Sequence, residues 1–214
     1  MKVFLFDLDG TLIDSAEDIA LILRTTLERI GKTYKMPQSI KNFIGGGVKA
    51  LLERVLKEEF KEEYVELFRK YYRENPVIKT KPYKGIPDVL FNLKQEGKKL
   101  AVITNKPEDI SREILKRLNL LEFFDFIAGG DTFPEKKPSP MPLVRSLQIL
   151  GENVEGAIMI GDTSADITAA VCAGIKTAFA EWGYSEDVKI KADFYLKKPE
   201  DILGLISGGN KDVS

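Results

Sequence analysis

Short apolar runs recur along the chain, and segments with the 3.6-residue spacing of amphipathic helices separate them. Each run is almost wholly apolar, whereas a strand with one face in solvent would alternate between apolar and polar residues. Strands that are covered on both faces are typical of parallel sheets. The pattern therefore predicts strands over residues 2–8, 99–104, 126–129, 156–161, 175–180 and 192–196.

Helical patterns fill the spaces between most of these strands. A proline stands near the start of one pattern and a glycine directly follows the end of others, which is the usual punctuation of helices. The predicted helices cover residues 86–96, 107–118, 140–150 and 164–173. Strands that alternate with helices predict an α/β fold, a doubly wound, Rossmann-like parallel sheet.

The region after the first strand departs from this alternation, because residues 15–81 contain no convincing strand pattern. Apolar residues follow helical spacing there instead, over residues 15–30, 47–57 and 59–74. We therefore predict an α/β core formed by residues 1–14 and 82–214, with residues 15–81 inserted after the first strand as a small helical cap. The last residues, 207–214, are expected to form a frayed tail.

The composition removes several classes of function. The chain of 214 residues has a formal net charge of −1, which gives no electrostatic reason to expect nucleic acid as a partner. It contains no histidine, so Ser-His-Asp triads and histidine-ligated metals are excluded. Its one cysteine, Cys172, cannot form an internal disulfide, and its apolar helical surroundings predict a buried core residue. Acid–base chemistry would fall to carboxylates, lysines or tyrosines.

The sequence also gives no reason to expect a membrane partner. No stretch approaches the roughly 20 apolar residues that a membrane span needs. The apolar run before Asp7 is too short for a secretory signal. We therefore expect a cytoplasmic protein that is a monomer or a homodimer.

Acidic residues stand at two of the predicted strand ends, although a buried, unpaired carboxylate is very costly. Asp7 and Asp9 follow the apolar run VFLF, and Asp162 and Asp166 lie in the segment GDTSAD. Ligands of open parallel sheets bind at the carboxyl ends of the strands, so these four acids are expected to converge there. They would repel one another unless a cation lay among them, and a hard, oxygen-seeking ion such as Mg²⁺ fits best.

Three further residues are expected at the same edge of the sheet. Thr104 and Asn105 end the second strand, and Lys137 in the segment KKPSP would bring the opposite charge. A dication, a lysine, a threonine and helix N-termini together form a site for a phosphoryl group. The residues therefore predict phosphoryl chemistry at the strand ends.

Four segments, in order, resemble the motifs of the haloacid dehalogenase superfamily: DLDGT at 7–11, VITN at 102–105, KKP at 136–138 and GDTSAD at 161–166. The helical insertion resembles the cap that members carry between their first two motifs. The resemblance implies that Asp7 is the nucleophile and Asp9 the general acid/base. It also implies that phosphate is bound by Thr104, Asn105 and Lys137. The implied Mg²⁺ site consists of Asp7, the Asp9 carbonyl oxygen and Asp162, supported by Asp166.

The residue types suit this chemistry in their own right. A carboxylate is ionised at neutral pH without an activating base, so Asp7 can attack phosphorus directly in a chain without histidine. The acyl phosphate can then pass to water, while Asp9 protonates the leaving alkoxide and afterwards takes a proton from water. Dehalogenases of the superfamily displace a halide and lack an acid at the Asp9 position. Its presence here favours an oxygen leaving group.

A glycine-rich segment bears on the substrate. Gly45, Gly46 and Gly47 stand directly before a predicted helix, with Lys49 on its first turn. We hypothesise that this element faces a small anionic substrate and sets specificity. TNKP at 104–107 and the glycine loop most resemble the phosphoglycolate phosphatases of the superfamily. The expected reaction is Mg²⁺-dependent hydrolysis of a small phosphorylated metabolite, 2-phosphoglycolate, to glycolate and phosphate.

Three alternatives remain open. A sibling hydrolase acting on pyrophosphate, a nucleotide or a sugar phosphate would share every core residue. Phosphosugar mutases of the superfamily carry a histidine in the cap, which this chain lacks. Signalling receiver domains also place acids, a threonine and a lysine at strand ends. Their paired acids are adjacent, however, the phosphorylated aspartate lies on a later strand, and they lack a helical insertion.

Overall fold

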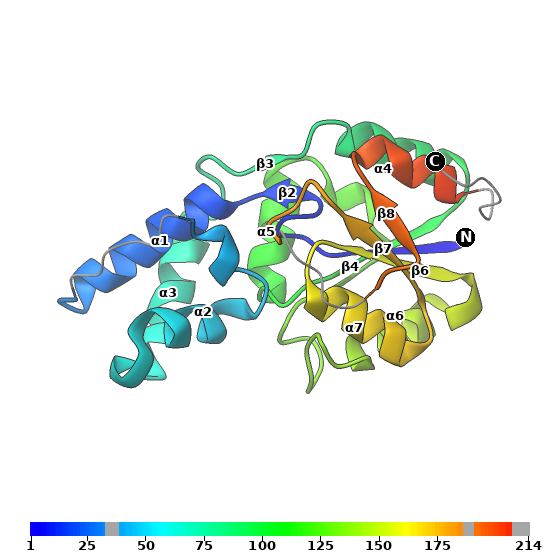
Figure 1. Cartoon of the computed structure of the whole chain (residues 1–214). Coiled ribbons are helices and arrows are strands. Elements are labelled where there is room, and N and C mark those ends of the chain that lie inside the picture. The colour runs from blue at the N-terminus through cyan, green and yellow to red at the C-terminus, as the bar shows by residue number, and fades with distance from the viewer. Residues whose placement is uncertain (33–38, 186–190, 207–214) are drawn as a thin grey trace.

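A six-stranded parallel sheet forms the centre of the molecule (Figure 1). The computed structural model describes residues 1–32, 39–185 and 191–206, and the predicted frayed tail at 207–214 lies outside them. The strand order is β5-β4-β1-β6-β7-β8, with every neighbouring pair parallel. The strands are β1 (Val3–Phe6), β4 (Lys99–Ile103), β5 (Phe126–Ala128), β6 (Ala157–Gly161), β7 (Lys176–Ala180) and β8 (Phe194–Leu196). The six predicted strands are thereby confirmed.

Helices cover both faces of this sheet, which confirms the doubly wound fold. One face packs against α4 (Ile86–Gln95), α5 (Glu108–Arg117) and the 3-10 helix η5 (Pro199–Leu205), and the other against α6 (Met141–Leu150) and α7 (Ser164–Ala173). Side chains of β1 alternate between the two cores, as the pleat of a strand requires. Phe4 and Phe6 join the first core, and Val3 and Leu5 join the second.

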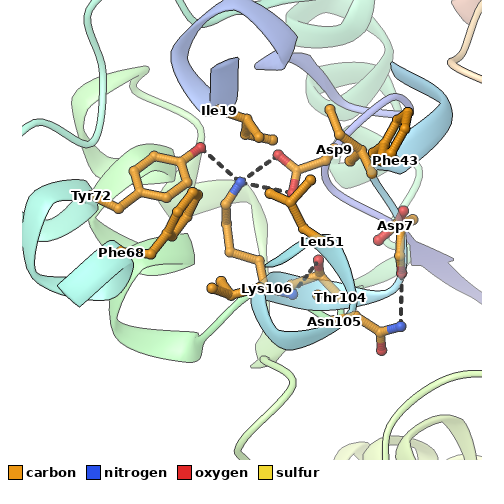
Figure 2. A pocket seen from close by; sticks show the side chains of 14 residues that line it. Asp7, Asp9, Ile19, Phe43, Leu51, Phe68, Tyr72, Thr104, Asn105 and Lys106 are labelled. Carbon is orange, nitrogen blue, oxygen red and sulfur yellow. Dashed lines mark hydrogen bonds and ion pairs between the residues drawn. The ribbon is translucent and has the colours of Figure 1, made fainter. Parts of the chain in front are cut away.

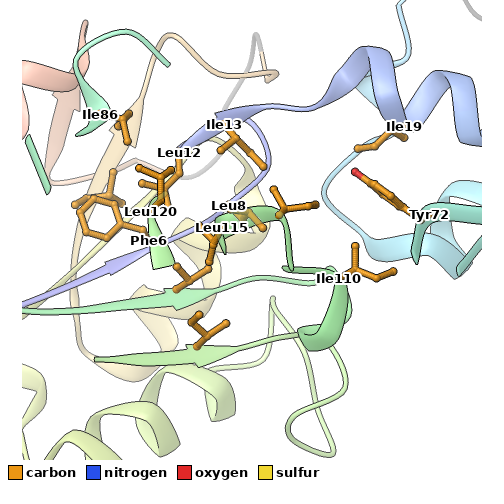
Figure 3. Close-up of a cluster of buried hydrophobic side chains, with 14 of the residues drawn as sticks. Phe6, Leu8, Leu12, Ile13, Ile19, Tyr72, Ile86, Ile110, Leu115 and Leu120 are labelled. Carbon is orange, nitrogen blue, oxygen red and sulfur yellow. The ribbon is translucent and has the colours of Figure 1, made fainter. Parts of the chain in front are cut away.

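Three helices of the insertion lie beyond the carboxyl end of β1 (Figure 1). They are α1 (Ala16–Arg29), α2 (Gly47–Leu56) and α3 (Glu63–Glu74). Their buried apolar side chains belong to the same cluster as those of α4 and α5. Figure 3 shows Ile19 and Tyr72 of the insertion on the side of this cluster next to Ile110 of α5. The insertion is therefore packed onto the sheet domain through apolar contacts.

The remaining helical elements are short 3-10 turns. They are η1 (Lys41–Phe43), η2 (Lys57–Glu59), η3 (Leu121–Phe123) and η4 (Val154–Gly156). Among the residues that the structure describes, no helix combines the length and apolar character needed to cross a membrane.

A two-stranded antiparallel sheet joins the two ends of the insertion. Its strands are β2 (Ile13–Asp14) and β3 (Lys81–Pro82). The sequence pattern does not predict them, because two residues are too few to show an alternation. The pairing falls where the boundary between core and cap is predicted. The division into domains itself stays a prediction.

Asp18, in the first turn of α1, ties that helix to the chain that returns to β3. Its carboxylate accepts hydrogen bonds from the backbone N–H groups of Ile78, Lys79 and Thr80, each at 2.9 Å. The Thr80 hydroxyl donates to it as well, at 2.5 Å. Burial works to raise the pKa of Asp18, but these hydrogen bonds outweigh it and leave the pKa below its ordinary value. The charged Asp18 side chain therefore stabilises the base of the insertion, where it links α1 to residues 78–80.

Cys172 lies exposed on α7, so the prediction of a buried core cysteine is wrong. The helix instead buries Asp166, Ile167, Ala169 and Ala170. Apolar residues occur on both faces of α7, so the sequence pattern cannot tell which face packs inward.

Candidate active site

The predicted core residues meet at the carboxyl ends of three neighbouring strands. Asp7 directly follows β1, and its backbone N–H donates to the Ile160 carbonyl oxygen of β6 at 2.9 Å. Thr104 directly follows β4, and its N–H donates to the carbonyl oxygen of Ala128 at 2.9 Å. Strand pairing thus continues to the site. Every predicted core site residue is buried, with at most 8% exposed: Asp7, Asp9, Thr104, Asn105, Lys137, Asp162 and Asp166.

Three of these carboxylates form a compact cluster. One oxygen each of Asp7, Asp162 and Asp166 lies within 4.8 Å of the others. Burial, opposed by Lys137 and reinforced by neighbouring acids, raises the pKa of Asp7 to about 7. Burial and the charges of Asp7 and Asp166 also raise the pKa of Asp162 well above its ordinary value. A cation among these oxygens would stabilise the charged forms of Asp7 and Asp162 and so lower both pKa values. The cluster therefore fits a hard divalent ion.

Lys137 brings a positive charge to this cluster, as predicted. Its Nζ lies 2.9 Å from Asp7 Oδ1 and 2.6 Å from Asp166 Oδ1. Burial tends to lower the pKa of Lys137, but the two carboxylates outweigh it, and the pKa lies above the ordinary lysine value. The neighbouring Lys136 is exposed and donates to the Gly46 carbonyl oxygen at 2.9 Å. Lys137 is therefore the lysine that faces Asp7.

The turns after β1, β6 and β7 hold the acids in place. Thr11 donates its hydroxyl to Asp162 Oδ1 at 2.9 Å, and the Tyr184 N–H donates to Asp162 Oδ2 at 2.8 Å. Gly10 has a φ of +90°, and a Cβ there would lie 2.2 Å from Asp162 Oδ2, so only glycine fits between them. Asp166 accepts hydrogen bonds from the N–H and hydroxyl of Thr163 and so caps α7.

The Asp9 side chain points away from the acid cluster. Both of its oxygens accept hydrogen bonds from Lys106 Nζ, at 2.6 and 2.7 Å, and the Ser15 hydroxyl donates to Oδ1 at 2.5 Å. Lys106 also donates to the Tyr72 hydroxyl of α3 at 2.9 Å (Figure 2). Burial raises the pKa of Tyr72 to about 12, so the hydroxyl keeps its proton at neutral pH. Asp9 is thus linked to the insertion directly through Ser15 and indirectly through Lys106, which contacts Tyr72.

Asn105 connects the loop of the insertion to the core. Its amide nitrogen donates to the carbonyl oxygens of Gly45 and Lys137, both at 2.9 Å. Both side-chain hydrogens are used in this way, so the side chain fixes the two loops.

A pocket opens between these core residues and the insertion. The core contributes polar residues, namely Asp7, Asp9, Thr104, Asn105 and Lys106. The insertion contributes Tyr72 and a largely apolar wall, namely Ile19, Phe43, Ile44, Gly45, Gly47, Val48, Leu51 and Phe68. Figure 2 shows the Lys106 ammonium between the Asp9 carboxylate and the Tyr72 hydroxyl. The site can therefore bind one charged end of a ligand while apolar side chains keep water out.

Residues 4–180 match the family model for haloacid dehalogenase-like hydrolases. The chain belongs to this family. It is 56% identical over 206 residues to a phosphoglycolate phosphatase of Aquifex aeolicus (strain VF5), which covers 96% of this chain and 97% of the relative. It is 38% identical to a phosphoglycolate phosphatase of Neisseria meningitidis serogroup A, over 93% of this chain and 88% of the relative.

The solved structures agree with the family assignment. A predicted phosphoglycolate phosphatase from Haemophilus somnus 129pt matches with a TM-score of 0.85 at 30% identity, over 95% of this chain and 97% of that one. The superfamily resemblance, the fold and the enzyme class, a phosphoric monoester hydrolase, are thereby confirmed. A signalling receiver domain is excluded.

Lys49, by contrast, does not reach the pocket of this haloacid dehalogenase-like hydrolase. It lies on the first turn of α2 as expected, but its side chain is 50% exposed and forms an ion pair with Glu62. Val48 and Leu51 are the α2 residues that line the pocket. The direction of a side chain on a helix depends on which face packs inward, and the glycine pattern alone did not determine that face. Gly45 and Gly47 do line the pocket, whereas Gly46 does not.

Two polar residues of the pocket lining, Lys106 and Tyr72, were not among the predicted site residues, nor were its apolar residues. A signal for Lys106 is present in the sequence, because it directly follows Thr104 and Asn105 in the segment TNKP. Tyr72 lies within a helical pattern rich in charged residues, where nothing marks a tyrosine as part of a site. Its place follows only from the packing of α3 against α1.

Proposed function

We propose that the chain is a Mg²⁺-dependent phosphatase of the cytoplasm that hydrolyses 2-phosphoglycolate to glycolate and phosphate through an aspartyl-phosphate intermediate on Asp7. The observation that carries this proposal is the position of Asp7. It lies at a strand end, in contact with Lys137, within the acid cluster and in the lining of the pocket.

The acid cluster would hold the metal. Asp7 and Asp162 offer carboxylate oxygens, the Asp9 carbonyl oxygen is the third proposed ligand, and Asp166 supports the site from α7. Oxygen ligands of this kind suit Mg²⁺. When bound, the ion would neutralise charge shared by the nucleophile and the phosphate group.

The core side chains would carry out the bond changes. Asp7 attacks phosphorus, the bond to the ester oxygen breaks, and Asp9 acts as the general acid that gives a proton to the leaving alkoxide. Asp9 then accepts a proton from the water that attacks the aspartyl phosphate, which releases phosphate and restores Asp7. Thr104, the Asn105 backbone N–H and Lys137 would hold the oxygens of the transferred group.

Two observations support a small substrate. The relatives with the highest identity given above are phosphoglycolate phosphatases. The wall that the insertion contributes is mostly apolar, with the Tyr72 hydroxyl as its one polar side-chain group among the described lining residues. A sugar or nucleoside would leave several hydroxyl groups without partners there, at a cost of about 1–3 kcal/mol for each buried group.

The insertion would act as the cap of this site. Its three helices and the loop with Gly45 and Gly47 form the wall opposite the core, and β2 and β3 join its two ends. We therefore retain the division into a core, residues 1–14 and 82–214, and a cap, residues 15–81. Closure of the cap would keep the aspartyl phosphate away from unwanted acceptors.

A panel of phosphorylated metabolites tests the substrate assignment. Phosphate release with Mg²⁺ should be fastest, by kcat/KM, for 2-phosphoglycolate. Pyrophosphate, nucleoside monophosphates and sugar phosphates represent the sibling hydrolases. A higher kcat/KM for any of these would replace 2-phosphoglycolate as the proposed substrate without affecting the assignment of Asp7.

A further inference from the structure

Lys106 is a buried cation in the wall of the pocket. It is 6% exposed, and no other residue among those described in the lining carries a positive charge. Its present partners are the two oxygens of Asp9 and the hydroxyl of Tyr72. An ammonium group has three hydrogens, so a bound anion would share or replace one of these partners.

Tyr72 offers a second donor at the same place. Its hydroxyl oxygen accepts a hydrogen bond from Lys106, and its own hydrogen has no acceptor among the residues that the structure describes. The side chain is 1% exposed and lines the pocket, so a ligand bound there would lie beside it. A buried donor without a partner is unfavourable unless a ligand or water satisfies it.

Lys106 lies two positions after Thr104, the proposed phosphate binder, and both residues line the pocket. The Lys106 backbone N–H donates to the hydroxyl oxygen of Thr104 at 3.2 Å, so this hydrogen bond stabilises the turn that carries both residues. A ligand that contacts both residues must fit between them and the apolar wall of the insertion. A long or bulky molecule would instead have to displace the apolar wall.

We propose that Lys106 and Tyr72 together bind the carboxylate of the substrate and so select a two- or three-carbon phosphoester with an acidic end. This inference rests on the proposed function, and it replaces Lys49 by a core residue as the cation that recognises the substrate. The Lys106 ammonium supplies the charge, and the Tyr72 hydroxyl supplies a second hydrogen bond from the insertion. Recognition of the carboxylate would thus involve the core and the cap at once.

The test compares two substrates of similar size, 2-phosphoglycolate and ethyl phosphate, which has no carboxylate. The measured quantity is the ratio of their kcat/KM values. Lys106→Met should lower this ratio at least about tenfold, since a charge-assisted hydrogen bond is lost for one substrate alone. Tyr72→Phe, which keeps the ring and removes the hydroxyl, should lower it about threefold to tenfold. The ratio for Lys106→Arg should stay closer to the wild-type ratio than the ratio for Lys106→Met does.

Lys49→Met is the matched control, because it removes a lysine that is half exposed and paired with Glu62. Its ratio should equal that of the wild type. Inhibition by inorganic phosphate provides a second readout, because phosphate lacks a carboxylate. The inhibition constant should change far less in Lys106→Met than the KM for 2-phosphoglycolate.

Several results would overturn the inference. An unchanged ratio in both Lys106→Met and Tyr72→Phe would exclude carboxylate recognition by this pair. Equal losses on both substrates would mean that Lys106 acts only through Asp9. If Lys106→Met does not fold, as judged by circular dichroism, the ratio in Tyr72→Phe decides. A wild type that shows no preference for 2-phosphoglycolate would instead refute the proposed substrate, which is a separate outcome.

Discussion

The two sides of the pocket are built in different ways. On the core side, each polar residue is held by another, as Asp7 is by Lys137 and Asp162 is by Thr11. On the side of the insertion, apolar side chains and two glycines form the wall, with the Tyr72 hydroxyl among them. The core side is organised for chemistry on a phosphoryl group. The opposite side can only select by shape, by exclusion of water and by the few polar groups that reach it.

The largest effect is expected from Asp7→Asn, which tests the core side. An amide cannot attack phosphorus, so kcat should fall below about one hundredth of the wild-type value while circular dichroism shows a folded protein. Asp88→Asn, an exposed change in the first turn of α4, is the control and should leave kcat unchanged. A kcat for Asp7→Asn above about a hundredth would rule out direct attack by Asp7.

Removal of divalent ions also tests the core side of the pocket, and it should lower kcat by a similar factor. The buried carboxylates of Asp7, Asp162 and Asp166 repel one another without a cation, so EDTA should abolish activity and excess Mg²⁺ should restore it. Ca²⁺ should bind without supporting turnover, because its looser shell can engage both oxygens of Asp7. Full activity in excess chelator, or with Ca²⁺ alone, would contradict the proposed metal site.

A moderate effect is expected from Gly47→Ala on the side of the insertion. Gly47 has a φ of +84°, and a Cβ there would lie 2.9 Å from the Asn105 carbonyl oxygen, so the loop must move away from the core. We expect kcat/KM to fall about tenfold on 2-phosphoglycolate and ethyl phosphate alike, because closure rather than recognition is disturbed.

Gly97→Ala is the matched control for that change. Gly97 also has a positive φ, of +66°, but a Cβ there meets nothing within 4 Å. It should cost about 1–2 kcal/mol of stability from backbone strain and leave kcat/KM unchanged. If the two variants lose activity equally, the crowding at Asn105 is irrelevant to catalysis.

The smallest effect on activity is expected at the base of the insertion. Asp18→Asn should destabilise the fold by about 1–3 kcal/mol, because charge-assisted hydrogen bonds to the chain at Ile78–Thr80 are weakened. The native pKa of Asp18 is lowered from 3.8, so its contribution is complete above about pH 4 and is lost as the pH falls through the native pKa. The difference in melting temperature from the wild type should therefore shrink below pH 4.

Glu17→Gln is the neighbouring control for Asp18. Glu17 forms an ion pair with Lys79, and both side chains are largely exposed, so its loss should change the melting temperature little. If the difference in melting temperature between Asp18→Asn and the wild type stays constant down to pH 2, the charge of Asp18 does not contribute to stability.

The positions of the site residues in the core could be predicted from the sequence more completely than those in the insertion, and the reason is physical. Continuous apolar runs locate buried parallel strands, and the residues after them must lie at the carboxyl edge. Asp7, Thr104 and Asp162 are therefore placed by local pattern alone. Lys137 follows from charge complementarity, although it comes from a loop.

The directions of side chains in the insertion depend on packing between helices, which a local sequence pattern does not show. The spacing predicted α2, yet Lys49 points to the surface, because the inward face of α2 is fixed by its packing against α3. Tyr72 meets Lys106 only through the fold, across 34 positions of the chain. Strands β2 and β3 are defined by their pairing and not by their own residues.

A trapping experiment tests whether Asp7 carries the phosphoryl group. The wild-type protein is mixed with 2-phosphoglycolate and Mg²⁺, quenched within the first turnover and treated with borohydride, which reduces an aspartyl phosphate to homoserine. Mass spectrometry of the peptide that contains Asp7 should then show homoserine at that position, and Asp7→Asn should show none. Homoserine at Asp9 or another acid, or no reduced residue while phosphate is released, would contradict the assignment of Asp7 as the nucleophile.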